Sequence, residues 1–565
     1  MQKIWNMAPC DFKKAADLSR LLNVPSIIAQ ILINRGMEDA EIAKHFLNAD
    51  RKNLFDPFLL KDMDKAVYRI QEAQKNKEKI LIYGDYDVDG VTSAAVLIKT
   101  LRALGLDVIN YIPHRVEEGY GLNLEIASFA KSQGIHLLIT VDCGITANKE
   151  IDALNAQGID VVVIDHHEPS EILPKAYAII NSKRKDCDYP CKDLAAVGTV
   201  AKMVQALTGE IPQDVMNFVA MGTIADVVSL TSENRIFVKE GLKGIAQTQN
   251  LGLKALLQIG KIQEKELSPF HIGFVLGPRI NAAGRMDSAQ TALDLFLTDD
   301  PHKALQLAKQ LDGFNADRQK MQKDILEEAL NKIEQEMNFN QEKIIVIAQE
   351  SWHRGVLGIV ASKIVEKYYR PAIVISLEDN IGTGSARSID GFHLFDALAA
   401  CSSFLEEYGG HKGAAGLTIK KDNIEPFKKK INQMAEDFLE IKKLLPTVFI
   451  DAEISLRDID IHLARLIKSL EPYGEGNPSP VFCSRNLSVI SEPQILGKET
   501  LKFWVTDGRQ TLSAVGFGMA KYKEMLTPEN YIDLAYEIII DDWNKTPTPQ
   551  LKLKDIKLSE VEEAF

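Results

Sequence analysis

The sequence has few cysteines, little positive charge and no long hydrophobic run. Only six cysteines are scattered over 565 residues, which excludes a disulfide scaffold and suits a reducing cytosol. Apolar runs stay below the ~18 residues that a membrane span requires, and Lys202 and Asp226 interrupt the two best candidates. The first residues, from Met1 to Asn6, lack the apolar core of a signal peptide. We therefore expect a cytoplasmic protein that does not cross a membrane.

Acidic residues outnumber basic ones, with 79 aspartates and glutamates against 66 lysines and arginines, so the formal net charge is −13. This balance argues against a protein that coats nucleic acid through an overall basic surface. It leaves room for a nuclease, since bound metal ions neutralise clustered carboxylates and a DNA track needs only local basic residues. On charge alone, an enzyme acting on small molecules is the simpler interpretation. The length predicts roughly three or four domains.

One short stretch concentrates three acids. The apolar run Lys79–Tyr83 has the length and β-branched content of a buried strand. Aspartates follow at alternate positions, Asp85, Asp87 and Asp89, and we expect a helix to begin near Val91. Three adjacent carboxylates repel one another, and a divalent cation, which prefers oxygen ligands, would relieve that repulsion. The alternative is a solvated, aspartate-rich turn.

Two further predicted strands also end in metal-binding side chains. His136–Val141 leads into Asp142, and Asp160–Ile164 leads into Asp165-His166-His167. Helical segments separate these strands, so the pattern predicts a doubly wound parallel sheet of the α/β class. The carboxyl ends of parallel strands share one edge, where such folds bind ligands. A single acid at a strand end is usually a cap, but three such ends predict a shared site.

These blocks carry a family resemblance. GDYDVDG, VDCG and DHH, in this order, resemble the signature motifs of the DHH phosphoesterase superfamily, and residues 222–228 resemble its fourth acidic motif. From about residue 65 to the C-terminus the chain resembles the RecJ family of bacterial single-strand-specific 5′→3′ DNA exonucleases. The blocks that narrow the resemblance are His114–Leu122, Gly277–Arg285, Trp352–Gly358, Gly384–Ser388 and Gly409–His411. It implies hydrolysis of phosphodiester bonds to 5′-mononucleotides, in DNA repair and recombination.

The resemblance implies a catalytic centre that binds Mn²⁺ or Mg²⁺, with two ions sharing one set of oxygen and nitrogen ligands. Many superfamily members have a histidine where this sequence has Tyr83, so one ion would have fewer ligands here. The number of ions stays open, and so does the choice of ligand between the paired histidines. The implied metal ligands are Asp85, Asp87, Asp89, Asp142, His166, His167 and Asp226, with Asp87, Asp142, His166 and His167 as catalytic candidates.

A second set of residues would hold the DNA. Tyr120 stands between two glycines near Arg115, a pairing suited to base stacking and phosphate contact, although the ring could instead pack on its own domain. Residues 382–388 read as a small-residue turn whose N–H groups, hydroxyls and guanidinium would converge on phosphate. The resemblance gives the full substrate-binding set as Arg115, Tyr120, Arg279, Asn281, Arg285, His353, Ser385, Arg387, Ser388, Gly409, Gly410 and His411.

We expect an N-terminal helical extension, a DHH catalytic domain, a helical connector, a smaller α/β DHH-associated substrate-binding domain and a C-terminal OB-fold barrel. Their expected ranges are 1–64, 65–235, 236–340, 341–444 and 445–565. The resemblance places the extension against the catalytic domain. Dense charge from Ala304 to Met337 reads as the solvated face of one long helix or two.

Alternating apolar and polar residues after residue 445 predict the barrel, and the resemblance identifies it as an OB-fold. Most aromatic side chains in a small barrel belong to its core. Lysines and aromatics in this segment are nevertheless candidate DNA contacts: Lys498, Lys502, Phe503, Trp504 and Trp543.

Two other function classes compete with the exonuclease. A DHH phosphodiesterase acting on nanoRNA or cyclic dinucleotides would share both α/β domains, but such enzymes generally lack the terminal barrel. A catalytically dead scaffold is opposed by the intact acids and histidine pair. For the exonuclease we expect single-stranded DNA with a 5′ end as the substrate and a helicase and a single-strand-binding protein as partners. We also expect a monomer and no membrane contact.

Overall fold

The structure, a computed structural model, describes residues 3–115, 117–262, 266–339, 341–438, 444–542 and 546–559. The chain forms two compact units, and each collects segments that are distant in the sequence. Trp543, one of the predicted DNA contacts, lies outside the described residues. The larger unit comprises Asp56–Asp226 and Glu240–Leu445, and the smaller comprises Met1–Phe55, Val227–Lys239 and Pro446–Phe565.

The larger unit contains the predicted parallel sheet, with five strands in the order β3-β2-β4-β5-β6. All neighbours pair in parallel, and Ile80 lies opposite Val108 in the register. The direction of winding reverses between β2 and β4, the place where doubly wound sheets bind ligands at their carboxyl ends. The strands are β2 (Lys79–Gly84), β3 (Asp107–Tyr111), β4 (Ile135–Val141), β5 (Asp160–Ile164) and β6 (Ala178–Ile180).

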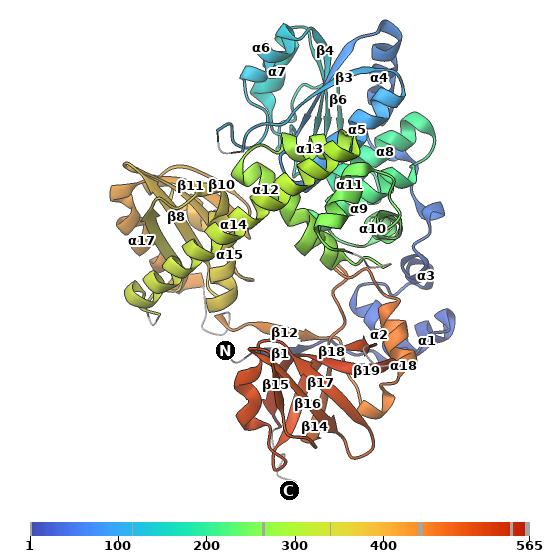
Figure 1. Ribbon diagram of the computed structural model, residues 1–565, viewed down its shortest axis with the longest axis vertical. Coiled ribbons are helices and arrows are strands. Elements are labelled where there is room, and N and C mark those ends of the chain that lie inside the picture. Colours follow the sequence, from blue (N-terminus) through green and yellow to red (C-terminus); the bar gives the residue numbers. More distant parts are fainter. Residues whose placement is uncertain are drawn as a thin grey trace. The chain divides into compact units, whose positions relative to one another are not determined.

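Helices cover both faces of this sheet (Figure 1). On one face α6 (Glu125–Ser132) and α7 (Asn148–Ala156) pack on buried residues such as Leu81 and Val161. α9 packs on α5 and α8 and ends beside the strand ends, where Asp226 follows it. The helices on and behind the other face are α4 (Met63–Asn76), α5 (Val88–Ala103), α8 (Ala196–Thr208) and α9 (Gln213–Ala225).

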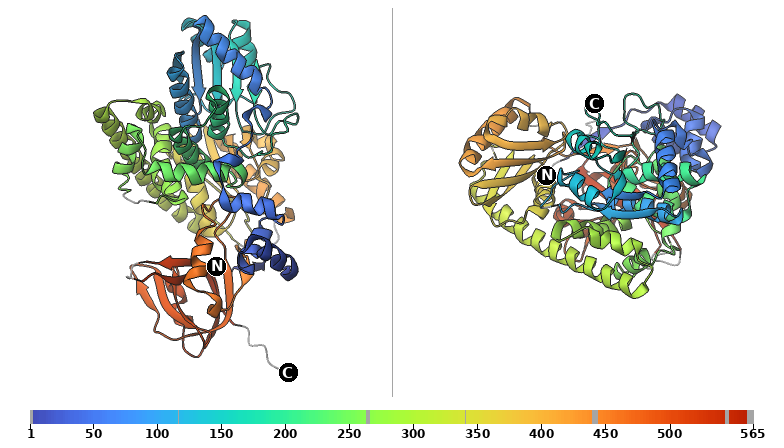
Figure 2. Two further views of the ribbon diagram at one scale, coloured as in Figure 1. Left: turned by 90° about the vertical axis from the view of Figure 1, so that its right-hand side faces the viewer. Right: turned by 90° about the horizontal axis from the view of Figure 1, so that it is seen from above.

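A run of helices links this sheet to a second one. The alternative of one long helix or two is resolved, because α14 is a single helix of 36 residues, capped by the Asp300 side chain (Figure 2). It packs on α11, α12 and α13 and then on α15. The run consists of α11 (Leu251–Ile259), the π-helical segment η3 (His271–Leu276), α12 (Gly277–Met286), α13 (Gln290–Leu297), α14 (Pro301–Glu336) and α15 (Leu357–Tyr368).

The second sheet has the strand order β10-β11-β9-β8-β7. The prediction of a turn at 382–388 is wrong, because residues 382–387 belong to β9, whose backbone pairs with β8 and β11 on its two sides. Its glycines allow close packing, since a Cβ on Gly382 would lie 2.7 Å from the Ile375 side chain. The other elements are β7 (Ile345–Glu350), β8 (Ala372–Glu378), β9 (Ile381–Arg387), α16 (Leu394–Ala399), β10 (Leu405–Gly410), β11 (Ala414–Lys420) and α17 (Ile424–Phe438).

A ring of paired strands forms the centre of the smaller unit. The ring runs β14-β16-β17-β19-β18 and returns to β14, with β17 and β19 parallel and the other neighbours antiparallel. Five strands joined in this way match the predicted OB-fold. The strands are β12 (Thr447–Ile450), β13 (Ala452–Glu453), β14 (Phe482–Val489), β15 (Gln494–Leu496), β16 (Thr500–Thr506), β17 (Thr511–Gly516), β18 (Tyr531–Asp541) and β19 (Thr548–Leu558).

The N-terminal segment belongs to this smaller unit, where the Phe46 carbonyl accepts a hydrogen bond from Arg235, a residue of the range 65–235 expected for the catalytic domain. The apolar face of α2, with Ile28 and Ile31 fully buried, shares one core with the barrel, and β1 pairs with β12. Along the described residues no single helix is long and apolar enough to cross a bilayer; α1 and α2 reach that composition only together, across a 111° bend. Besides the barrel strands, this unit contains β1 (Ile4–Met7), α1 (Phe12–Leu22), α2 (Ser26–Asn34), α3 (Ala40–Asn48) and α18 (Ile461–Lys468), and α10 (Ser232–Ile245) begins in it and ends in the larger unit.

Candidate metal centre and substrate site

The alternating aspartates occupy the connection from β2 to α5, but the helix begins earlier than predicted. α5 starts at Val88 and not near Val91, because the Asp87 carboxylate caps it. That carboxylate accepts hydrogen bonds from the backbone N–H groups of Asp89 (2.8 Å) and Gly90 (3.1 Å). Asp89 therefore lies inside the first helical turn instead of a loop.

Asp89 is buried and points at the amino end of α8. Its carboxylate accepts from the backbone N–H groups of Ala196 (2.7 Å) and Val197 (2.9 Å), and helix amino ends favour negative charge. Gly222 of α9 leaves the space that this carboxylate needs, because a Cβ there would lie 2.7 Å from Asp89 Oδ1. The packing of α8 and α9 thus holds the third aspartate in place.

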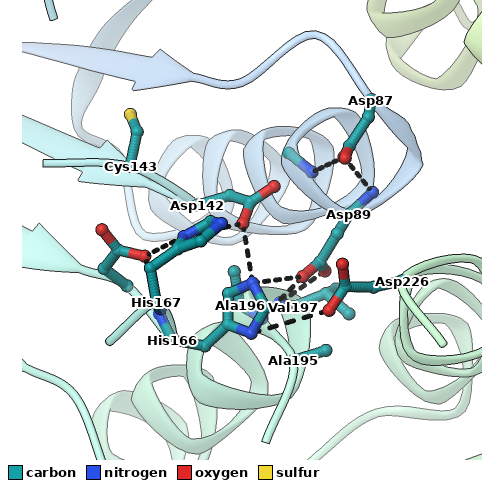
Figure 3. A network of polar contacts seen from close by, with 12 residues as sticks. Asp87, Asp89, Asp142, Cys143, His166, His167, Ala195, Ala196, Val197 and Asp226 are labelled. Carbon is teal, nitrogen blue, oxygen red and sulfur yellow. Dashed lines mark hydrogen bonds and ion pairs between the residues drawn. The ribbon is translucent and has the colours of Figure 1, made fainter. Parts of the chain in front are cut away.

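The strand ends, the first turn of α5 and the end of α9 bring Asp142, Asp89 and Asp226 together around His166 (Figure 3). His166 Nε2 lies 3.2 Å from Asp142 Oδ1 and 3.9 Å from Asp89 Oδ2. On the other side of the ring, Nδ1 lies 3.6 Å from Asp226 Oδ2. Three overlapping groups of ligand atoms result: Asp89, His166 and Asp226; Asp142, His166 and His167; and Asp85, Asp87 and Asp142.

The carboxylates are crowded in a buried setting. Burial raises the pKa of Asp85, Asp89 and Asp142, and the charges of neighbouring aspartates raise it further. Burial and the charge of Asp87 raise the pKa of Asp226 to about 7. Each of these shifts reflects the free energy needed to keep like charges together away from water. A bound cation would remove that cost.

The nitrogen and oxygen donors of the site fit such a cation. Burial and the charge of His167 lower the pKa of His166 to about 3, so its imidazole is neutral. Within the described segments, both ring nitrogens of His166, Asp85 Oδ1 and Asp142 Oδ1 are buried without a hydrogen-bond partner. Buried polar atoms normally have partners. Carboxylate and imidazole donors without a thiolate suit Mn²⁺ or Mg²⁺.

His167 is held differently from His166. Its Nδ1 lies 2.7 Å from Asp165 Oδ1, and although burial opposes the shift, this hydrogen bond raises the pKa of His167 to about 9. Asp165 also accepts from the backbone N–H groups of Ile145 (3.0 Å) and His166 (2.7 Å), so its carboxylate is fixed. Asp165 was absent from the predicted site residues, although it is the first residue of the DHH block. It orients the His167 ring.

Tyr120 reaches the same histidine. Its hydroxyl lies 3.1 Å from His167 Nδ1, while the residue as a whole is 52% exposed. The hydroxyl therefore packs on the site and the ring remains open for stacking. Tyr83, at the position where the superfamily has a histidine, packs in the core, and its hydroxyl donates to the Gly121 carbonyl (2.8 Å). Tyr83 thus supports the loop that carries Tyr120.

Arginine side chains gather beside the carboxylates. Burial and the charges of Arg115, Arg318 and Arg387 lower the pKa of Arg285 to about 9. Arg285 and Arg318 line a cavity of about 150 Å³. Arg318 was missed because α14 was interpreted as a solvated face, yet only 9% of this residue is exposed. It lies on the same buried face of α14 as Ile325, seven positions further along the helix. This spacing could have predicted from the sequence that Arg318 is buried.

Two residues predicted to contact substrate also have partners within the fold. Arg279 Nε donates to Asp312 Oδ1 (2.9 Å), which ties α12 to α14. Asn281 Oδ1 accepts from the backbone N–H of Val88 (3.1 Å), which adds to the capping of α5. Asn281 also lines the cavity beside Arg285. These residues position the elements that carry the site.

Ser385 and Arg387 project from the same face of β9, toward α15. A Cβ on Gly358, in the first turn of α15, would lie 2.8 Å from Arg387 Nη2, so the guanidinium rests on that turn. A guanidinium at a helix amino end favours an anion. Burial and the charge of Arg387 lower the pKa of His411, which places its ring near the same group.

Among the other residues predicted for this pocket, His353 and Ser388 make hydrogen bonds within the fold. His353 Nδ1 accepts from the backbone N–H of Gly355 (3.1 Å), and the Ser388 hydroxyl donates to the Phe392 carbonyl (2.8 Å). Gly409 and Gly410 end β10 and lead into His411. Of the residues predicted for this pocket, Ser385 and Arg387 leave β9 on the α15 face, since alternate residues of a strand point to opposite faces.

The candidate DNA contacts on β16 alternate between the core and the outer face of the barrel. Phe503 is 1% exposed and belongs to the barrel core, so the prediction that it contacts DNA is wrong. Lys502 and Trp504 flank it on the outer face of β16, where Trp504 is 45% exposed. Lys498 lies in the turn between β15 and β16. The second and third strands and the adjoining loops form the usual ligand face of an OB-fold, and β16 is the second strand of the ring along the chain.

Comparison with known proteins agrees with this arrangement. Three protein-family profiles match the chain: the DHH family N-terminal domain at residues 79–223, the DHHA1 domain at 341–437 and the RecJ OB domain at 450–555. A single-stranded-DNA-specific exonuclease RecJ from Bacillus subtilis (strain 168) is 38% identical over 560 residues, covering 98% of this chain and 71% of its own length.

Solved structures of RecJ from Thermus thermophilus are also similar. The structure in complex with Mn²⁺ has a TM-score of 0.84 at 28% identity, covering 99% of this chain and 80% of the other. The structure in complex with Mg²⁺ has a TM-score of 0.79 at 27% identity, with coverage of 99% and 79%. Both similarities extend over nearly all of the chain.

Proposed function

The chain belongs to the RecJ family of single-stranded-DNA-specific exonucleases, and we propose that it removes 5′-mononucleotides from the 5′ end of single-stranded DNA. One observation carries this proposal: a carboxylate–histidine centre and a cluster of arginines meet within one compact unit. A DHH phosphodiesterase acting on nanoRNA or cyclic dinucleotides is not favoured, because the chain also matches the RecJ OB domain. DNA repair and recombination are the processes that such an exonuclease serves.

We assign Mn²⁺ or Mg²⁺ as the cofactor, in line with the ions bound in the Thermus thermophilus structures. When bound, divalent ions supply an activated water and neutralise charge on the phosphate. The neutral imidazole of His166 makes it the better metal ligand of the histidine pair. The residues that would hold metal are Asp85, Asp87, Asp89, Asp142, His166 and Asp226.

The chain's other residues bind and orient the strand. His167 keeps a proton through its hydrogen bond with Asp165 and so presents positive charge to the phosphate. In this proposal Arg115 and Arg285 bind backbone phosphates, and Arg387 binds the terminal one. Tyr120 is placed to stack on a base. Action as a monomer, a cytoplasmic location and cooperation with a helicase and a single-strand-binding protein stay predictions.

Digestion of end-labelled single-stranded DNA with Mn²⁺ or Mg²⁺ tests the proposal. A 5′ label should be released at once as a mononucleotide, while a 3′ label should remain on strands that shorten gradually. The reverse pattern would contradict the assigned polarity. His166→Ala and Asp87→Ala should abolish release while keeping the fold. His136→Ala is the matched control, because that histidine lies exposed on β4 outside the metal ligands.

A further inference from the structure

Two phenylalanines stand out on the surface of the larger unit. Phe270 and Phe274 are 60% and 73% exposed, which makes them the most exposed aromatic side chains described in this unit. Their rings stack on each other, with centroids 5.2 Å apart and an angle of 24° between the planes. Large apolar side chains are rarely left in contact with water as a group, and such groups usually mark binding surfaces.

The backbone that carries these rings is unusual as well. Phe274 lies in the π-helical segment η3. Phe270 comes directly before this segment, and α12 follows directly after it. π-helical turns inside α-helices occur often at functional sites. Here the turn places both phenylalanines on one side of the segment. Neither the metal centre nor the core of the unit uses these rings.

The same segment borders the proposed substrate site. Gly273 and Gly277 line the cavity of about 150 Å³ that also contains Asn281, Arg285 and Arg318. A Cβ on Gly273 would meet no atom within 4 Å, so the cavity is open at this point of the wall. One continuous helical stretch therefore presents cationic and amide side chains to the cavity and aromatic rings to the adjoining surface.

We propose that Phe270 and Phe274 form a stacking platform for bases of the bound single strand, continuing the contact that begins at the arginine cluster. This inference rests on the proposed function and names a further part of its substrate site. Aromatic rings beside phosphate-binding cations are the usual means of holding unpaired strands, and they tolerate any sequence because every base has a π-face. Paired bases in a duplex have their faces covered, so the platform also favours single strands.

An abasic scan tests the platform in the full chain, with His166→Ala as an inactive background so that the DNA stays intact. Short single strands, each lacking one base at a different position, are titrated by fluorescence anisotropy. We expect one or two positions where base loss weakens binding roughly 5- to 150-fold, the equivalent of one stacked base. Adding Phe274→Ala should remove that dependence on the base, and Phe274→Trp should keep it.

The outcomes separate the inference from the proposed function. If the background protein fails to bind single-stranded DNA, the proposed function itself is wrong. If it binds but Phe274→Ala and the double variant with Phe270→Ala keep the same abasic profile, the platform is wrong. A protein-docking surface would then be the better interpretation. Phe12→Ala is the matched control, because this phenylalanine is 82% exposed in the other unit and should leave the profile unchanged.

Discussion

Two adjacent histidines at the end of β5 are held in opposite protonation states. His166 is enclosed by three carboxylates yet neutral, because burial lowers its pKa to about 3. His167, next in the chain, keeps its proton through its hydrogen bond with Asp165, which raises its pKa to about 9 despite burial. A metal ligand must offer a lone pair, whereas a group that stabilises phosphate charge must carry a proton. The pair therefore divides two tasks.

The pKa of Asp226 gives a pH-dependent prediction. Burial and Asp87 raise this pKa to about 7, above the ~3.9 of an unfolded aspartate, so the metal-free folded protein binds the additional proton. The stability that this proton contributes is present at low pH and is lost as the pH rises toward about 7. Thermal unfolding with a chelator should show Tm falling over this range, and Asp226→Asn should flatten the fall.

Metal affinity should depend on pH in the opposite direction to stability, through the same carboxyl of Asp226. Because the ligand must lose its proton, Mn²⁺ affinity should rise from about pH 6 to about pH 8, with proton release seen by calorimetry in two buffers. Asp107→Asn, an exposed aspartate at the start of β3, is the control and should change neither dependence. An unchanged slope in Asp226→Asn would show that this carboxyl is not the titrating group.

Tyr120 combines a ring for stacking with a hydroxyl on the site, and two substitutions separate these roles. Tyr120→Ala should lose roughly 1–3 kcal/mol of binding to single-stranded DNA, the usual worth of one stacked base. Tyr120→Phe keeps the ring and should retain most of that affinity. Binding of single strands to the metal-free protein is the measurement. Equal losses in both variants would mean that the hydroxyl contact with His167, and not stacking, is what matters.

At the scale of elements, the sequence predicted the parallel sheet and the convergence of its strand ends, because buried parallel strands leave continuous apolar runs. It misplaced elements where side chains carry little periodicity. Residues 382–388 contain glycine and alanine, which suggested a turn, yet their smallness lets β9 pack against Ile375 and Leu417. The α5 start was missed because a capping aspartate and a metal ligand have the same side chain.

Because residues 382–387 form a strand and not a turn, a terminal phosphate would be held differently from the prediction. Its backbone N–H groups are used in the sheet, so recognition depends on side chains, above all on Arg387 against the first turn of α15. Arg387→Ala should therefore lower the preference for a 5′-phosphate over a 5′-hydroxyl by about tenfold, consistent with one charge-assisted hydrogen bond. Competition between the two oligonucleotides measures the ratio.

Arg354→Ala is a matched control, since that arginine pairs with Glu378 at the surface of the same sheet. An unchanged ratio in Arg387→Ala would remove Arg387 from this role. Lost activity with an unchanged preference would instead place the residue in general substrate positioning.

At the scale of the whole molecule, the smaller unit is assembled from three segments that are distant in the sequence. Residues before 56, around 233 and after 445 fold together, and α2 shares a core with the barrel. Apolar periodicity could show that α2 has a buried face, but it could not show which partner covers that face. A chain ending at 444 would uncover Ile28 and Ile31. Point substitutions on the outer face of β16 are therefore the better test of the barrel.

The last prediction concerns that face. The metal centre and phosphate pocket hold only a few nucleotides, whereas an OB-fold binds about 4–16. Lys502→Ala should weaken binding of a ~40-nucleotide single strand and reduce the salt slope by about 0.7, the effect of one phosphate contact. Trp504→Ala should weaken binding with little change in slope, because stacking involves no counterion. Phe449→Ala, an exposed ring on β12 outside the strand ring, should match the unmodified chain. Identical affinities and slopes in all three variants would make the outer face of β16 a surface for a protein partner instead of DNA.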